Sequence, residues 1–384
     1  MVVDLEAVDA NLATLLAQLP ADEAALTLRP ATKSLRIPAV MRHLGAASKR
    51  LRGWMTFSAH ETAWLHAQGF DDFLLAYPIG RADEATALAK MVQGGATLTI
   101  AVDCEAHVTL LADAARTHGV VLGICLDLDA AWRPLGGRLH FGVRRSPLRT
   151  VSAAVSLAAC VRNTGVLKVR AVLAYEAQVA GIRDVNPGSR HLDLVRRLIK
   201  RRSRPLAATR RSQVVAALRQ AGHTVTVVNG GGTGSLASTS TDGTCTEVTA
   251  GSGFLCPHLF DGYAGLALVP AVFFALPVTR TADPGWVTCA SGGYIASGAT
   301  GVDRAPIVHL PNGLSPEPME GFGEVQTPFR LGRETPRLSL GDPVLLRHAK
   351  SGELAERFDR VLLVRGDTVI ETARTYRGHG QAFG

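Results

Sequence analysis

The stretch LTIAVDCEAHVTLLADAARTHGVVLGICLDL, residues 98–128, decides the fold class. Residues 98–102 and 120–128 are runs of mainly apolar residues, and residues 107–118 between them have the apolar spacing of a helix. Strand, helix and strand within about 30 residues is the pattern of a parallel βαβ unit. Because the strands are continuously apolar, we expect helices to cover both faces of the sheet.

The same alternation continues on both sides of this stretch. We predict helices over 4–19, 37–51, 61–68, 81–92, 152–163, 190–202 and 210–221, and strands over 26–33, 73–77, 166–174 and 224–228. A series of this kind forms either an open doubly wound sheet or a (β/α)8 barrel.

The pattern changes after about residue 255. Short β-branched runs at 287–290, 306–310, 343–346 and 360–364 are separated by turn signals such as Pro311-Asn-Gly313 and Arg365-Gly-Asp367. The sequence therefore predicts an α/β domain followed by a second, mainly β domain.

The composition of the 384 residues excludes a disordered or collagen-like chain, because 47% are hydrophobic. The formal net charge is +8, and many of the cations lie between Arg196 and Arg211. Such a cluster can bind nucleic acid, but no aromatic residue is interleaved with it to stack on bases. We therefore interpret it as a solvated helix face and loop.

Six cysteines occur without any C-x-x-C pair, which fits neither a zinc ribbon nor a small disulfide scaffold, so free thiols are expected. The first ten residues, MVVDLEAVDA, lack the basic region of a signal peptide. The longest apolar run, 265–278, is too short for a membrane span and contains two prolines. We expect a soluble protein of the cytoplasm.

Glycines follow the predicted strand at 224–228, in the run Gly230-Gly-Gly-Thr-Gly-Ser235. Their backbone N–H groups could form a nest for a phosphate. The run lacks the Lys of a Walker loop and does not match G-x-G-x-x-G, so a surface turn is the alternative. In a barrel this loop would lie late in the strand order at the carboxyl-terminal face, where phosphates usually bind.

Lys33 follows the first predicted strand, where a barrel collects its chemistry. A lysine directed into a barrel mouth is desolvated, which lowers its pKa and makes it a nucleophilic amine able to form a Schiff base. A solvated loop lysine is the common alternative. Together with a phosphate-binding loop, however, Lys33 matches what pyridoxal 5'-phosphate requires: an amine for its aldehyde and a nest for its phosphate.

The stretch Arg29-Pro-Ala-Thr-Lys-Ser34 resembles the lysine motif of the D-threonine aldolase and D-serine dehydratase family, pyridoxal-phosphate enzymes of fold type III related to alanine racemase. Further similar stretches follow in the same order: 69–72, 75–78, Tyr175-Glu176, 229–235, Glu247 with 250–252, Gly341-Asp342 and His348. The resemblance covers essentially the whole chain. It implies a pyridoxal-phosphate-binding (β/α)8 barrel over 12–258 and a β-rich domain over 259–384 that includes 1–11.

The resemblance also implies roles for single residues. Lys33 would carry the cofactor, and His348 matches the histidine of the family's metal-binding His-x-Asp or His-x-Cys motif. The remaining implied contacts to the cofactor are Tyr175 in its pocket, and Gly231, Gly232, Thr233 and Gly234 at its phosphate, together with Ser252 or Tyr263. Proteins of this kind usually form homodimers, in which segment 348–353 would serve the other subunit.

The chain departs from the family pattern in its metal motif. Lys350 stands where the motif has Asp or Cys, and an ammonium group cannot ligate a metal. Either Glu353 replaces the lost ligand of a divalent Mn, Mg or Zn ion, or Lys350 itself supplies positive charge near the substrate hydroxyl. We favour Lys350.

Two other positions differ as well. Gln178 stands where the family often has a histidine as candidate base, which leaves the base unassigned. His140 lies near a position where relatives carry an arginine, with Arg138 and Arg144 close by. One of these three is expected to contact the cofactor's phenolate oxygen, and the sequence does not decide which.

The resemblance implies a lyase that cleaves D-configured β-hydroxy-α-amino acids by a retro-aldol reaction. Dehydration of D-serine or D-threonine is the alternative within the family. Racemisation would need a tyrosine on the second face of Cα, for which Tyr263, Tyr294 and Tyr376 are available. A non-catalytic pyridoxal-phosphate carrier is disfavoured, because such proteins are typically a barrel alone.

Overall fold

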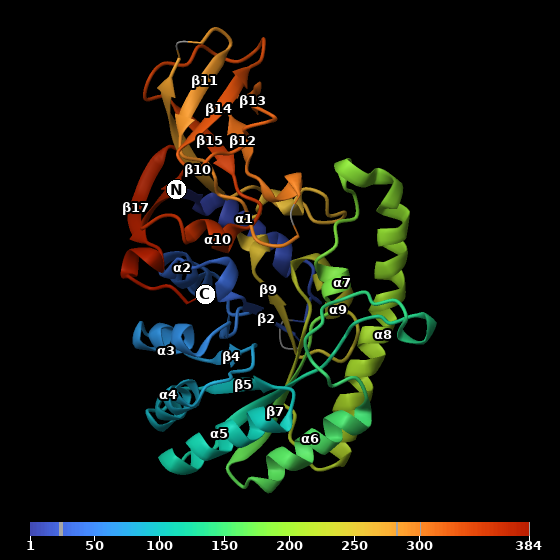
Figure 1. The fold of residues 1–384 in the computed structure, drawn as a ribbon. Helices are drawn as coiled ribbons and strands as arrows, with labels where there is room; N and C mark the ends of the chain where they lie inside the picture. Colours follow the sequence, from blue (N-terminus) through green and yellow to red (C-terminus); the bar gives the residue numbers. More distant parts are fainter. Residues whose placement is uncertain (23–25, 282, 300, 384) are drawn as a thin grey trace.

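The computed structural model describes residues 1–22, 26–281, 283–299 and 301–383. Its lower part in Figure 1 is a barrel of parallel strands surrounded by helices, and its upper part is a separate sheet built mainly from strands that follow residue 270. The predicted fold class, a (β/α)8 barrel with a carboxyl-terminal, mainly β domain, is confirmed.

The barrel has the strand order β2-β9-β8-β7-β6-β5-β4-β3. Its strands are β2 (Thr27–Pro30), β3 (Trp54–Thr56), β4 (Phe73–Leu75), β5 (Leu98–Val102), β6 (Leu122–Asp127), β7 (Leu167–Ala174), β8 (Val227–Gly230) and β9 (Glu247–Ala250). The outer strands of this order meet through two isolated bridges, Leu28 with Leu51 and Ala31 with Met55, which nearly close the barrel.

Helices pack outside these strands and cover their apolar side chains. They are α2 (Pro38–Ala47), α3 (Ala59–Ala67), α4 (Ala82–Gln93), α5 (Glu105–His118), α6 (Val151–Asn163), α7 (Ala177–Ala180), α8 (Asp193–Gln220) and α9 (Leu236–Ser240). Ile100, Ile124 and Val172 on the strands are fully buried. The continuously apolar strands are therefore explained by burial on both faces.

The second sheet has nine strands and includes the start of the chain. They are β1 (Val2–Asp4), β10 (Val272–Arg280), β11 (Trp286–Ala290), β12 (Ile307–Leu310), β13 (Leu314–Pro316), β14 (Gln326–Leu331), β15 (Pro343–Arg347), β16 (Arg360–Arg365) and β17 (Thr368–Arg374). Strand β1 pairs antiparallel with β10 and parallel with β16, and α1 (Leu5–Leu16) then leads the chain towards the barrel. The domain limits of 12–258 and 259–384 stay a prediction.

The helical segments predicted at 190–202 and 210–221 were wrong as separate helices, because they form the single helix α8. Pro205 lies inside this helix on its exposed side, where water can bind the carbonyl that a proline cannot pair. Two barrel strands, β3 and β9, have no predicted counterpart.

Short elements connect the two parts of the molecule. The 3₁₀ turn η1 (Thr32–Ser34) follows β2, and α10 (Ser351–Ala355) follows β15 and packs against η1. The other 3₁₀ turns are η2 (Leu135–Gly137), η3 (Pro187–Leu192), η4 (Thr233–Ser235), η5 (Ser252–Phe254), η6 (His258–Phe260), η7 (Val302–Arg304) and η8 (Arg377–His379). Among the described residues, we find no helix whose length and hydropathy would suit a membrane span.

Candidate active site

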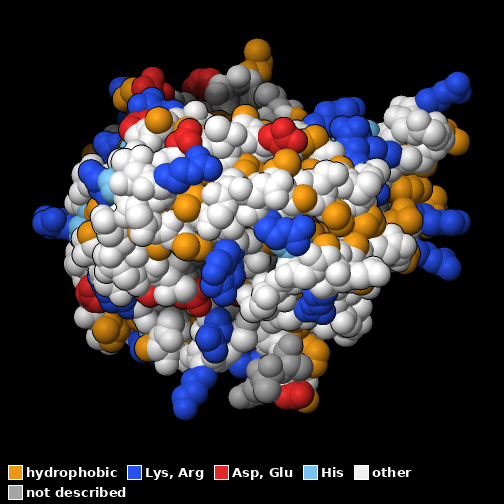
Figure 2. Space-filling model, turned by 90° about the horizontal axis from the view of Figure 1, so that it is seen from below, with side chains coloured by type: hydrophobic (Ala, Val, Ile, Leu, Met, Phe, Trp, Pro, Cys, Tyr) orange, Lys and Arg blue, Asp and Glu red, His pale blue; other side chains and the backbone are white. Residues whose placement is uncertain are grey.

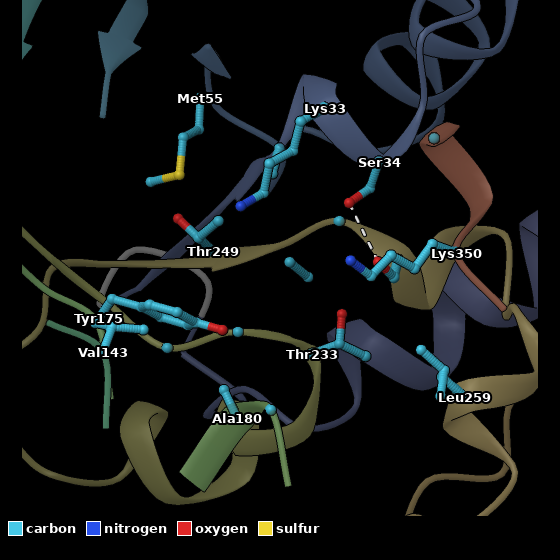
Figure 3. A pocket seen from close by; sticks show the side chains of 18 of the residues that line it. Lys33, Ser34, Met55, Val143, Tyr175, Ala180, Thr233, Thr249, Leu259 and Lys350 are labelled. Carbon is cyan, nitrogen blue, oxygen red and sulfur yellow. Dashed lines mark hydrogen bonds between the residues drawn. The ribbon is translucent and has the colours of Figure 1, made fainter. Parts of the chain in front are cut away.

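A cavity of about 630 Å³ opens at the carboxyl-terminal ends of the barrel strands. It is lined by segments that follow β2, β4, β6, β7, β8 and β9, and by residues 349–353 from the second part of the chain. Figure 3 shows that the amino groups of Lys33 and Lys350 both point into this space, with Tyr175 and Thr233 on its other side. Both parts of the molecule therefore contribute to one site.

Lys33 lies in η1, directly after the first barrel strand, as its place in the sequence predicts. Its Nζ donates a hydrogen bond of 2.7 Å to Oη of Tyr77. Burial would raise the pKa of Tyr77, but the ammonium of Lys33 and the guanidinium of Arg145 outweigh burial and lower it below its usual value. The lowered pKa favours the phenolate form of Tyr77, and in that form its oxygen can accept a proton from Lys33.

Tyr175 follows β7 and its ring packs against the glycine-rich loop. A Cβ added at Gly232 would lie 3.2 Å from Cε2 of Tyr175 and 2.9 Å from Cβ of Ala180. Burial raises the pKa of Tyr175 to about 12, so this phenol is neutral near pH 7. Tyr175 serves as a wall of the cavity.

The glycine-rich loop lines the cavity with Gly231, Gly232 and Thr233. Gly231 has φ +82°, a conformation that favours glycine. A Cβ at Gly234 would lie 2.3 Å from Cε1 of Tyr263, so Gly234 lets Tyr263 pack against the loop rather than lining the cavity itself. The loop can follow this path only without side chains.

A buried ion pair holds this loop from below. Glu176 accepts hydrogen bonds from N of Gly231 at 3.2 Å and from Oγ of Ser235 at 3.1 Å. Arg211, 1% exposed, donates to Glu176 at 3.1 Å and is also paired with Asp242. The amide of Gly231 is therefore used within the protein, and it stabilises the loop instead of facing a ligand.

Ser252 and Tyr263 also line the cavity. Oγ of Ser252 lies 3.2 Å from Oγ of Ser34, and the hydroxyl of Tyr263 donates to the carbonyl of Ala180 at 3.1 Å. Both predicted residues are thus at the site, and the Tyr263 hydroxyl already has a protein partner. Tyr294 and Tyr376 are not among the residues that line the cavity.

Arg145 lines the cavity, whereas the sequence left His140, Arg138 and Arg144 as candidates for the contact to the cofactor's phenolate oxygen. Its guanidinium is 5.6 Å from the ring centre of Tyr77 and 6.0 Å from that of Tyr175. His140 lies outside the cavity lining with Nε2 3.1 Å from the carbonyl of Gly142, and Arg138 and Arg144 are outside the lining as well. In the sequence, the pair Arg144-Arg145 indicates that an arginine is present here. Only the fold shows which of the two lines the cavity.

The segment at 348–353 forms the other wall. His348 is 2% exposed and lies outside the lining; its Nδ1 lies 2.5 Å from the carbonyl oxygen and 3.0 Å from the amide nitrogen of Lys350, so it is paired with that backbone in either tautomer. Burial lowers the pKa of His348, although hydrogen bonds to the backbone at Lys350 and Tyr294 oppose this. Lys350 and Glu353 do line the cavity. The structure thus brings Lys33 and Lys350 to one site but not His348.

The eight cations between Arg196 and Arg211 are divided between exposed and partly or fully buried positions. Lys200, 3% exposed, pairs with Asp184 at 2.8 Å, and Arg211 is buried beneath the loop, so a solvated face was wrong for these two. The solvated face is right for the four exposed residues, Arg197, Arg201, Arg202 and Arg204. On the face shown in Figure 2, Lys and Arg side chains occur in separate groups among apolar and polar side chains.

No protein-family model matches the chain. A curated relative, 3-hydroxy-D-aspartate aldolase from Paracoccus denitrificans, is 26% identical over 184 residues, which is 48% of this chain and 42% of the relative. The match thus spans less than half the length of that relative.

Solved structures match almost the whole chain. D-threonine aldolase from Filomicrobium marinum has a TM-score of 0.81 at 22% identity, covering 98% of this chain and 94% of that one. Alanine racemase from Clostridium difficile has a TM-score of 0.62 at 11% identity, covering 97% of both chains. This chain has an alanine racemase-like fold. The resemblance inferred from the motifs is confirmed as a likeness of fold.

D-threo-3-hydroxyaspartate dehydratase from Delftia sp. HT23 shares the alanine racemase-like fold with a TM-score of 0.74 at 19% identity, covering 97% of this chain and 96% of that one. Two further structures of a dehydratase of that name are a histidine-to-alanine variant and a cysteine-to-alanine variant in the metal-free form, with the two substituted positions two residues apart. That spacing equals the spacing of His348 and Lys350.

The residues at this cavity fit pyridoxal phosphate, the cofactor implied by the motifs. An amine is available in Lys33, and the glycine-rich loop offers the hydroxyls of Thr233 and Ser252 to an anion, at a place where a Cβ at Gly232 would collide with Ala180 and Tyr175. A divalent metal does not fit in the same way. Among the described residues, the one group of three potential ligands is Asp103, Cys104 and His107, which lies outside the cavity lining.

Proposed function

We propose that this chain is a pyridoxal-phosphate-dependent lyase that cleaves D-β-hydroxy-α-amino acids by a retro-aldol reaction. The observation that carries the proposal is the placement of Lys33 in one cavity with the glycine-rich loop and Lys350. The similarity to D-threonine aldolase and to 3-hydroxy-D-aspartate aldolase supports the substrate class.

The residues of the cavity would divide the work. Lys33 would hold the cofactor's aldehyde carbon, and Tyr77 would orient the Lys33 amine and, in its phenolate form, accept a proton from it. When bound, the cofactor would supply an electron sink for the bond that breaks at Cα of the substrate. The hydroxyls of Thr233 and Ser252 would donate hydrogen bonds to its phosphate.

Arg145 and Tyr175 would act on the cofactor ring. The guanidinium of Arg145 lies near both Tyr77 and Tyr175. There it would place positive charge beside the negatively charged phenolate oxygen of the cofactor. Tyr175 would cover the ring and exclude water, since its own hydroxyl stays protonated. We propose that the protein acts as a homodimer in the cytoplasm, as proteins with these motifs usually do.

Dehydration is the second candidate, favoured by the similarity to the Delftia dehydratase. The two reactions differ in their products: D-threonine would give glycine and acetaldehyde by cleavage, but 2-oxobutanoate and ammonia by dehydration. Product analysis therefore separates them.

The visible absorbance of the purified protein tests the proposal. We expect an absorption band of bound cofactor that is lost in Lys33→Ala and retained in Lys90→Ala, a matched change of an exposed lysine on α4. Turnover of D-threonine should fall at least about a thousandfold in Lys33→Ala, because the nucleophile is removed. A colourless protein that cannot be reconstituted with pyridoxal phosphate would contradict the proposal.

A further inference from the structure

We propose that the ammonium group of Lys350 binds the β-hydroxyl oxygen of the substrate and stands in place of a divalent metal ion, so that this site works without metal. The inference rests on the proposed function and deepens it. It names Lys350 as the group that recognises the hydroxyl, in place of the metal ion that the family motif implies.

The position of the Lys350 ammonium is fixed by two partners. Nζ donates to Oγ of Ser297 at 2.8 Å and lies 3.1 Å from Oε1 of Glu353. An ammonium group has three N–H donors, so these two partners leave one for a ligand. Figure 3 shows the Lys350 side chain pointing into the cavity, and the free donor is therefore available to a bound substrate.

Direct contact between two backbone segments sets Lys350 relative to Lys33. Oγ of Ser351 donates to the carbonyl of Ser34 at 2.9 Å. A Cβ added at Gly352 would lie 1.8 Å from the carbonyl oxygen of Lys33, so glycine is needed for α10 to approach η1 this closely. The backbone of Lys33 and Ser34 thus lies directly against residues 351 and 352, which follow Lys350 in the chain.

A metal site at this position would need ligands that the structure has already used. Nδ1 of His348 is hydrogen-bonded to the backbone of Lys350, and the buried ring does not line the cavity. Both carboxylate oxygens of Glu353 accept hydrogen bonds from Ser297, at 2.6 Å and 2.7 Å. The Lys350 ammonium would also repel a divalent cation. The pairing of His348 and Glu353 within the protein, together with the ammonium of Lys350, therefore disfavours a metal ion at this position.

The dehydratase structures make the contrast concrete. In that dehydratase, a histidine and a cysteine lie two residues apart, and the variant without the cysteine is in a metal-free form. Here Lys350 has that spacing from His348 and brings its own positive charge. A charged N–H donor recognises a hydroxyl oxygen by a hydrogen bond, with no exchangeable ion.

Binding of two amino acids to the holoenzyme tests this role. D-threonine has a β-hydroxyl and D-alanine does not, and each would be titrated by the change in visible absorbance. In Lys350→Met we expect D-threonine to bind about 10- to 100-fold more weakly, because a hydrogen bond to a charged group is lost, with D-alanine changed less than twofold. Lys350→Arg should restore part of the preference, and Lys90→Met is the matched control on α4.

A metal titration tests the second half of the inference. Mn²⁺ added to the wild-type holoenzyme should show no stoichiometric site that depends on the cavity, and D-threonine binding should be unchanged by chelator. Any Mn²⁺ site removed by Cys104→Ser would belong to the Asp103–Cys104–His107 group and would leave the cavity metal-free, as expected. A Mn²⁺ site that survives Cys104→Ser but is lost in Glu353→Gln would overturn the inference.

The outcomes separate this inference from the proposed function. Equal weakening of D-threonine and D-alanine in Lys350→Met, or no weakening of either, would overturn the role of Lys350 and leave the proposed function standing. If no D-amino acid changes the absorbance of the wild-type protein, the proposed function itself fails.

Discussion

The glycine-rich loop at 230–235 and the segment at 348–353 line the same cavity, but different forces hold them. Beneath the loop, Glu176 and Arg211 are 3% and 1% exposed and form a buried ion pair. In the other segment, the pair of Lys350 with Glu353 has side chains about a third exposed, at 36% and 31%. The first wall therefore depends on charges that water cannot replace, whereas the second depends on contacts that water can partly replace.

This difference shows where a substitution should cost little stability. Removing one partner of a buried ion pair strands the other charge, so the loop and its anion cradle tolerate little change. A partly exposed ion pair contributes little to stability, so a new residue at 350 changes mainly what the cavity binds. The chain's departure from the family motif at Lys350 lies in the second wall.

The largest effect is expected for Arg211→Met. This change leaves Glu176 and Asp242 buried without their cation, which should lower the free energy of unfolding by about 3–5 kcal/mol. Arg204→Met, on the exposed side of the same helix, should change it by less than about 0.5 kcal/mol. Urea unfolding of both variants measures the difference, and equal losses would show that the loop does not depend on the buried pair.

A smaller effect is expected for Gly352→Ala at the contact between α10 and η1. The added Cβ would meet the carbonyl oxygen of Lys33, and the two segments must separate at a cost of about 1–3 kcal/mol. Gly80→Ala is the matched control, because a Cβ there meets no heavy atom within 4 Å. Thermal unfolding compares the two variants; a Gly352→Ala protein as stable as the control would mean that the second wall is not fixed by this contact.

The smallest effect concerns pH. Asp127 lines the cavity, and burial together with the nearby charge of Asp103 raises its pKa to about 7, despite the opposing guanidinium of Arg145. The folded protein thus holds this proton more tightly than the unfolded chain does. Its contribution to stability is present below about pH 4 and is lost as the pH rises towards about 7.

Asp127→Asn should therefore reduce the fall in unfolding free energy between about pH 4 and pH 7, by on the order of 1 kcal/mol. Glu61, a buried carboxyl outside the cavity lining whose pKa burial also raises to about 7, keeps a similar fall in the variant. Asp367→Asn, at an exposed position, serves as the control and should leave the pH dependence unchanged. An identical pH profile for Asp127→Asn and wild type would contradict the raised pKa.

Much of the barrel was predictable, because period and turn residues are local signals. Helices at 81–92 and 152–163 were predicted to within one residue at each end, whereas β3 and β9 were missed. Of the site, Lys33 and the loop were found because a lysine after a strand and a run of glycines are visible in sequence. Arg145 and the Arg211 pair with Glu176 were missed, because their roles depend on contacts between distant segments.

By itself, the sequence determined the alternation of strands and helices, the change to a β-rich second half, and the residue types at 33, 231–234 and 350. These follow from the spacing of apolar residues and from covalent structure, which act over a few neighbours. Only the tertiary structure decided that Arg145 rather than His140 lines the cavity. It also decided that the ring of His348 hydrogen-bonds to the backbone, and that Lys350 shares a cavity with Lys33. Those outcomes depend on the direction of side chains within the folded chain. Lys33 and Lys350 are over 300 residues apart, and only docking of α10 on η1 brings them to one cavity.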